Sequence, residues 1–150
     1  MTIEMAYSRF LDEFGPGKAM VLSTAVDGQV SSRTMSVVLL NGAFYFQTDC
    51  TLRKYRQLVD NPRAALCAGN VSLEGICEEI GAPAACPAFC TAYSECFPGS
   101  FERYSGLNNE RVFRFVPTRL ERWLYIDAEP YMEVFDFAKN TYDLSAYEGK

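Results

Sequence analysis

Histidine is absent from this 150-residue chain, and its absence removes the commonest general base and metal ligand of proteins. Nucleophile systems that pair serine or cysteine with histidine are excluded for the same reason. Any chemistry must therefore come from carboxylates, tyrosines, thiols or a bound cofactor.

Basic residues are also few, because 14 lysines and arginines stand against 19 acidic residues and leave a net charge of −5. Binding to a phosphate backbone needs a basic face, so this balance argues against a nucleic-acid partner. Long apolar runs are missing as well. The first 15 residues mix acids with apolar side chains, so we expect neither a signal peptide nor a membrane span. A cytoplasmic location is the resulting expectation.

Three of the six cysteines form the only cluster, at Cys86, Cys90 and Cys96. Without a secretion signal, reduced thiols are expected rather than a disulfide framework. The spacing lacks the paired C-x-x-C of zinc ribbons, and Cys86 and Cys90 would share one face of a helix, where a thiol packs as a small hydrophobe. We therefore interpret the cluster as structural and expect no metal site. An iron–sulfur or zinc centre is the alternative.

The first third of the chain predicts a helix followed by three strands. Apolar residues recur at helical spacing over residues 3–14, and Gly15-Pro16-Gly17 then stops the helix. From Lys18 to Thr48 the pattern changes to period two. The dipeptides Asp27-Gly28 and Asn41-Gly42 interrupt it, and both favour tight hairpin turns.

The rest of the chain alternates short strands with helices. The sequence predicts a two-turn helix that ends at Asn61-Pro62, strands over 64–68 and 71–80, one or two helices within 83–107, and strands over 111–117 and 120–126. Residues 132–137 alternate again, which indicates an edge strand or a dimer contact. About seven strands with inserted helices favour a mainly β fold, an antiparallel barrel in one domain over residues 1–150.

Phosphate-compatible side chains are densest between Ser31 and Lys54. In the segment SSRTMS, Arg33 lies among hydroxyl residues, and a helix begins near Thr51 with Arg53 and Lys54 in its first turn. Cations at a helix N-terminus oppose the helix dipole, whereas a phosphate there would satisfy the amides and the cations together. Solvated surface charges with hydroxyl caps are the alternative interpretation.

The segment SSRTMSVVLLNGAFYFQTDCTLRKYRQLVDNPRAAL resembles the FMN-binding split-barrel family typified by pyridoxamine-phosphate oxidase. In that family an arginine on the second strand, a threonine ending the third, and an Arg-Lys pair opening the next helix hold the flavin phosphate. The resemblance assigns these roles to Arg33, Thr48, Arg53 and Lys54. It further implies that residues beside the flavin ring are Thr34, Met35 and Ser36, with Gln47 near the phosphate.

The same resemblance bears on activity. A Pro-x-x-x-Glu-x-Trp pattern of the oxidase is similar to Pro117, Glu121 and Trp123, but the arginine and histidine that follow it and bind the oxidase's substrate are missing here. We therefore expect an FMN-dependent oxidoreductase that passes electrons from a donor such as NAD(P)H to a small acceptor, and not a pyridoxamine-phosphate oxidase. A non-catalytic flavin-binding electron carrier or redox sensor is the alternative.

Two further expectations follow from the family. Its split barrels form the flavin site between two subunits, so the resemblance implies a homodimer. A glutamine on the fifth strand often meets the ring, and Asn70 is its nearest counterpart. The only tryptophan, Trp123, is expected to pack in the core rather than to stack on the flavin.

Overall fold

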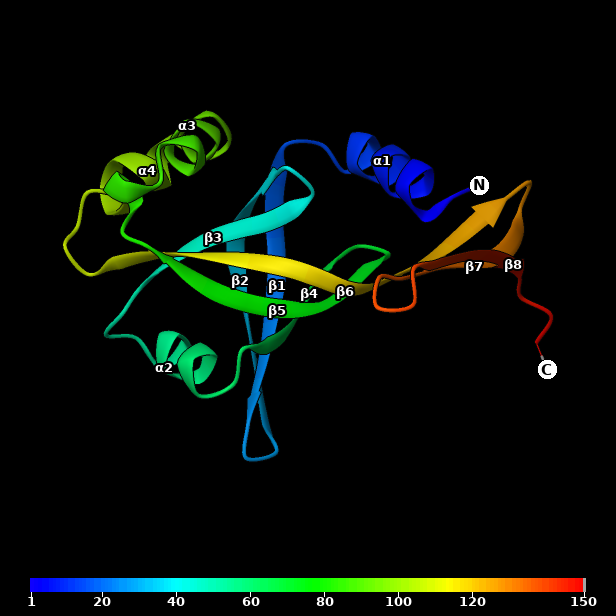
Figure 1. Ribbon diagram of the computed structural model, residues 1–150, viewed down its shortest axis with the longest axis horizontal. Coiled ribbons are helices and arrows are strands. Elements are labelled where there is room, and N and C mark those ends of the chain that lie inside the picture. Colours follow the sequence, from blue (N-terminus) through cyan, green and yellow to red (C-terminus); the bar gives the residue numbers. More distant parts are fainter. Residues whose placement is uncertain (150) are drawn as a thin grey trace.

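Eight strands and four α-helices account for most of residues 1–149, the part of the chain that the computed structural model describes (Figure 1). They follow in the order α1 (Ile3–Phe14), β1 (Gly17–Val26), β2 (Gln29–Leu40), β3 (Ala43–Asp49), α2 (Arg53–Asp60), β4 (Arg63–Ala68), β5 (Val71–Gly81), the 3₁₀ helix η1 (Pro83–Ala85), α3 (Pro87–Cys96), α4 (Pro98–Tyr104), β6 (Glu110–Ile126), β7 (Glu129–Asp136) and β8 (Thr141–Ala146). The expected mainly β fold with helical insertions is confirmed.

The sheet is antiparallel throughout, in the strand order β3-β2-β1-β4-β5-β6-β7-β8. An additional pairing of β3 with β6 closes the first six strands of this order into a barrel. Closure leaves those six strands without a free edge. Figure 1 shows α3 and α4 together near β3, whereas β7 and β8 extend away on the opposite side of the molecule.

Both predicted hairpin turns are confirmed by their backbone angles. Asp27 and Gly28 have φ of 51° and 78°, and Asn41 and Gly42 have φ of 49° and 79°. Two consecutive positive φ angles characterise the type I′ turn, whose twist matches that of the strands it joins. These turns fix β2 between β1 and β3, and β2 and β3 carry most of the residues discussed below.

Aromatic side chains fill the barrel and attach α1 to it. Phe44, Phe46 and Phe115 are at most 1% exposed. From α1, Phe10 is equally buried, and Phe14 meets Phe44 edge to face with ring centroids 5.4 Å apart. Burial of such rings is the main stabilisation of a domain this size, since each is worth about 1.5–3 kcal/mol.

Residues 111–117 and 120–126 were expected to form two strands, and this is wrong: they belong to the single 17-residue strand β6. The reason is a β-bulge in β6 itself, where Glu74 pairs with Arg119 and Gly75 with Pro117, so that Thr118 is the extra residue. The pairing of β5 with β6 shifts register between Glu74 and Gly75, and Thr118 donates its hydroxyl to the Glu74 carbonyl at 3.2 Å. The bulge absorbs the irregularity around Pro117, so β6 continues through it.

The C-terminal region differs from expectation in two respects. The segment 132–137 is not an edge strand, because β8, which the sequence reading missed, pairs with β7 on its outer side. Trp123 is not a core residue. It is half-buried and meets Tyr125 and Tyr147 edge to face, on the part of β6 that extends toward β7.

The six cysteines are free thiols. Within residues 1–149, no helix has both the length and the apolar character needed to cross a bilayer.

Candidate functional site

A cavity of about 380 Å³ lies between β2, β3, the beginning of α2 and the helices α3 and α4. This volume is within the range of about 300–1,000 Å³ that is usual for small-molecule sites. Six of the eight residues that the sequence predicted for cofactor binding line it: Thr34, Met35, Ser36, Gln47, Thr48 and Lys54. The barrel brings them together because β2 and β3 are hairpin neighbours and α2 follows β3 after a short turn.

Thr48 supplies the strongest polar signal in the cavity. Its side chain is 3% exposed, and its hydroxyl oxygen has no hydrogen-bond partner among the described residues. A buried hydroxyl without a partner costs about 1–3 kcal/mol, and such groups are rare in native proteins. A polar ligand atom in the cavity would supply the missing partner.

Lys54 provides the positive charge of the same cavity. It is the second residue of α2 and is half-buried, yet it makes no ion pair with a described residue. Burial lowers the pKa of Lys54, the Arg33 charge lowers it further, and Glu110 opposes both. An anion near this ammonium group would raise its pKa again and stabilise the charged form.

The N-terminus of α2 adds backbone donors. Leu52 is the N-cap residue and makes no side-chain capping hydrogen bond. At this position most helices have a serine, threonine, asparagine or aspartate, whose side chain accepts a hydrogen bond from one of the first amides of the helix. With Arg53 and Lys54 in the first turn, this helix end is positively charged and incompletely capped, which favours a bound anion.

Arg33, which the family resemblance assigns to the same phosphate as Thr48 and Lys54, lies outside the described lining of the cavity. Its guanidinium group donates to the carbonyl of Leu22 at 3.3 Å, to the hydroxyl of Thr24 at 2.9 Å and to Oε1 of Gln57 at 2.6 Å. All three acceptors are neutral. The guanidinium group is therefore hydrogen-bonded, but none of these partners carries a negative charge that would compensate its positive charge. Burial and the neighbouring Arg53 lower the pKa of Arg33.

Arg53 likewise does not line the main cavity. It borders a smaller depression of about 230 Å³, together with Arg56 and Gln57. Because Arg33 interacts with both Arg53 and Lys54, the three cations form one positive region around the start of α2. The structure therefore assembles six predicted residues in the cavity and places the two arginines beside it.

The sequence reading missed the opposite wall and one acidic group. Tyr93, Ser100 and Tyr104 of α3 and α4 face the cavity, and the hydroxyl groups of Tyr93 and Ser100 are 2.9 Å apart. Ser105, at the end of α4, donates to Oε1 of Gln47 at 2.8 Å and anchors this wall to β3. The contact between Ser105 and Gln47 spans 58 residues of the chain, so no local pattern could have placed this wall against β3.

Glu110 is the missed acidic group. It is the first residue of β6, is 6% exposed and pairs with Asp49 across the β3–β6 ladder. Both residues line the cavity. Asp49 accepts hydrogen bonds from the amide and hydroxyl of Thr51, both at 2.7 Å.

Asn70 lies elsewhere. Its side-chain amide donates to the Trp123 carbonyl at 2.9 Å, which ties the β4–β5 turn to β6. Neither residue is among the described residues that line the cavity.

The sequence and the fold were compared with known proteins. A family model described as pyridoxamine 5′-phosphate oxidase matches residues 9–124. Among curated proteins, no match was found.

Several solved structures share the fold. A pyridoxamine 5′-phosphate oxidase-related, FMN-binding protein from Nostoc punctiforme superimposes with a TM-score of 0.65 and 16% identity, over 96% of this chain and 92% of that one. PhzG from Burkholderia lata, in complex with tetrahydrophenazine-1-carboxylic acid, gives a TM-score of 0.61 and 16% identity, with 97% and 90% coverage. The haem storage protein HutZ from Vibrio cholerae gives 0.60 and 17%, with 78% and 91% coverage. At these identities the likeness concerns the fold alone.

Proposed function

The chain belongs to the pyridoxamine 5′-phosphate oxidase family, and on that premise we propose that it binds FMN in the cavity between β2, β3 and α2 and serves as a flavin-dependent oxidoreductase. One observation carries the proposal. The buried hydroxyl of Thr48 has no hydrogen-bond partner among the described residues, and it lines the same cavity as Lys54, a cation without an ion pair. A phosphate would provide an acceptor for the first and a counterion for the second.

The donor set suits a phosphate in particular. A phosphate monoester carries about −1.5 to −2 charges near pH 7 and offers three strong acceptor oxygens. Thr48 and Lys54 would contact it directly, and Arg33 and Arg53 would contribute positive potential from beside the cavity. The hydroxyl and backbone groups of Thr34, Met35 and Ser36, with the amide of Gln47, would border the rest of the cofactor.

When bound, FMN supplies reversible hydride transfer, which no amino-acid side chain provides. The protein's contribution is to hold the phosphate, to orient the cofactor along β2 and to limit access of water through the wall of α3 and α4. We propose NAD(P)H or a similar reduced donor and a small organic acceptor as reaction partners. Pyridoxamine phosphate is not the proposed substrate, because Leu124 and Tyr125 follow Trp123 where the oxidase pattern carries cationic residues.

Two chains would form the functional unit in this proposal. A chain of this length leaves one side of the cavity to be covered, and a twofold dimer would cover two cavities at once. Sedimentation of flavin-loaded protein at micromolar concentration should give twice the 16.9 kDa mass of the chain. A mass of one chain would contradict the dimer but leave the cofactor proposal intact.

The cofactor is tested on protein purified from cells that supply both flavin and haem. We expect a flavin absorption spectrum and release of FMN, in about one equivalent per chain, on denaturation. Haem in place of flavin, or a colourless protein that does not take up added FMN, would overturn the proposal.

Catalysis is tested separately by anaerobic addition of NADH or NADPH to the flavin-loaded protein. Bleaching of the flavin absorption at rates near the usual enzyme range of about 1–10³ s⁻¹ would support the oxidoreductase. A bound flavin that neither nucleotide reduces, but that chemical reductants do, would indicate the electron carrier instead.

A further inference from the structure

Glu110 is an acidic side chain inside a cavity that is otherwise equipped for an anion. Its residue is 6% exposed, and within residues 1–149 the structure shows no hydrogen bond or ion pair of its carboxyl group. It shares the cavity with Thr48 and Lys54. A buried carboxylate in this place would repel the phosphate that the neighbouring groups attract.

The charged groups around Glu110 come from three elements. Asp49 faces it from β3, Lys54 from α2, and Arg111 follows it on β6 and donates to the backbone carbonyls of Asn108 and Glu110. The tyrosines that α3 and α4 contribute to the cavity are the remaining titratable groups. One lysine therefore faces two carboxyl groups.

These surroundings shift the pKa values of the two carboxyl groups in opposite directions. Hydrogen bonds from Thr51 lower the pKa of Asp49. Burial raises the pKa of Glu110, the Asp49 charge raises it further, and Lys54 partly opposes this. Asp49 therefore stays ionised, and Glu110 is the group that accepts a proton most readily.

We propose that Glu110 couples phosphate binding in this cavity to proton uptake. When a phosphate-bearing ligand binds beside Lys54, the Glu110 carboxylate takes up one proton from solvent. This rests on the proposed function, since the phosphate is that of FMN. The change converts a carboxylate into a neutral carboxyl group and breaks no other bond. It leaves Lys54 to compensate the phosphate, and it gives Glu110 an O–H that can donate a hydrogen bond.

The expected size follows from electrostatic linkage. A charged neighbour within about 4–6 Å shifts a carboxyl pKa by about 1–3 units. Each unit is a factor of about ten in the affinity of the two protonation states for the ligand. FMN binding to the wild type should therefore weaken by about tenfold or more, relative to a protein without the carboxylate, as the pH rises through the Glu110 titration.

The test compares the wild type with Glu110→Gln from pH 5 to 8, by titrating FMN and riboflavin into flavin-free protein and following flavin fluorescence. The FMN phosphate has its own pKa near 6, but this titration is common to both proteins and cancels in the ratio of their dissociation constants. For FMN, the ratio of wild type to variant should rise with pH. For riboflavin, which has no phosphate, it should stay constant.

Two variants control for structural effects. Glu110→Asp retains a carboxyl group and should retain the pH dependence. Glu95→Gln makes the same chemical change on an exposed residue of α3 and should behave as the wild type. Should Glu110→Gln fail to fold, calorimetry of the wild type in two buffers of different ionisation enthalpy measures the proton uptake directly.

The outcomes separate the two proposals. FMN binding with a pH-independent ratio, or without net proton uptake in the calorimeter, overturns the role of Glu110 alone. A riboflavin ratio that changes as the FMN ratio does would also overturn it, because the effect would not depend on the phosphate. Failure of the wild type to bind FMN at any pH overturns both.

Discussion

Replacing Lys54 by methionine removes the positive charge of the cavity while retaining a side chain of similar length. Lys54 is half-buried and has no ion pair with a described residue, so the substitution breaks no ion pair within residues 1–149 and removes only the longer-range attraction between Lys54 and Glu110. A hydrogen bond to a charged group is worth about 1.5–3 kcal/mol, and about 1.4 kcal/mol corresponds to a factor of ten, so FMN should bind about 10- to 100-fold more weakly.

Riboflavin provides the internal reference for this prediction, because it has the same ring and ribityl chain but no phosphate. Its affinity should be the same in the wild type and in Lys54→Met. Both flavins are titrated into flavin-free protein, and the quenching of flavin fluorescence gives their dissociation constants. Arg33→Ala should also weaken FMN, but less than Lys54→Met, because Arg33 adds positive potential from beside the cavity. Arg33 additionally bonds to Leu22, Thr24 and Gln57, so a part of its effect would be structural.

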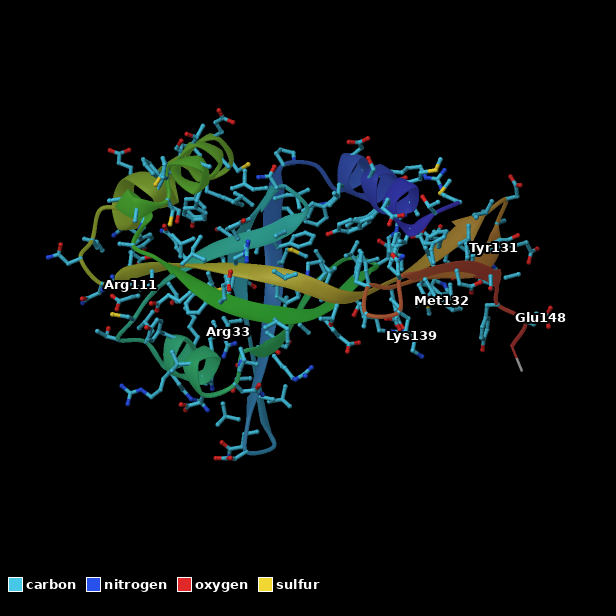
Figure 2. The ribbon with its side chains drawn as sticks, viewed as in Figure 1. Arg33, Arg111, Tyr131, Met132, Lys139 and Glu148 are labelled. Atoms are coloured by element: carbon cyan, nitrogen blue, oxygen red, sulfur yellow. The ribbon has the colours of Figure 1, made fainter. Side chains whose placement is uncertain are left out.

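Lys139→Met is the matched control, since it makes the same change on an exposed residue. Figure 2 shows Lys139 on the β7–β8 side of the molecule, away from Arg33. Both flavins should bind to it as to the wild type. Equal losses for FMN and riboflavin in Lys54→Met, or no loss for either, would refute the placement of the phosphate, and so would a loss of FMN affinity in Lys139→Met as large as that in Lys54→Met.

Four other predictions concern stability, thiols and substrate. Gly75→Ala should destabilise the protein by about 1–3 kcal/mol in denaturant titrations, because a Cβ there would lie 2.5 Å from the ring of Phe115; an unchanged midpoint would contradict this. Glu133→Ala should cost about 1–3 kcal/mol by the same assay, since the Tyr142 hydroxyl loses its acceptor and Arg122 keeps only Glu13 as a carboxylate partner. Iodoacetamide should modify the exposed Cys67 in the folded protein and Cys77 only after unfolding, because burial raises the pKa of Cys77 to about 12; mass spectrometry of peptides decides. Steady-state assays with pyridoxamine phosphate should show turnover below about 1 s⁻¹.

Local sequence signals were sufficient for most of the barrel. The type I′ turns could be predicted because Asp-Gly and Asn-Gly tolerate the positive φ angles that such turns require. The continuity of β6 could not, because Pro117 suggests a break, and only the pairing with β5 shows that β6 passes this point as a bulge at Thr118. Similarly, β8 is a mostly exposed strand with a weak apolar pattern, and its pairing with β7 defines it.

The candidate site likewise has one part that local sequence signals predict and one part that only long-range contacts define. Residues on β2, β3 and α2 could be assigned together because they are close in sequence and carry the family pattern. The wall formed by α3 and α4 could not be predicted, because its tyrosines reach the cavity through contacts such as that between Ser105 and Gln47. In the sequence, Glu110 is an ordinary charged residue at the end of a predicted strand. Only its pairing with Asp49 on β3 shows that it lies in the cavity.

The distribution of ion pairs gives an independent reason to expect an anion at the start of α2. The ion pairs that the structure shows between described residues all involve arginines of β6: Arg114, Arg119 and Arg122. Arg33, Arg53 and Lys54 have none, although the chain as a whole has a net charge of −5 and acidic partners are abundant. Their mutual repulsion is a cost that Glu110 offsets only in part, and a bound phosphate would offset more of it. Since a ligand that binds only the native state at a hundred times its dissociation constant adds about 2.7 kcal/mol to the free energy of unfolding, the cofactor would act as a structural element of this barrel as well as its source of chemistry.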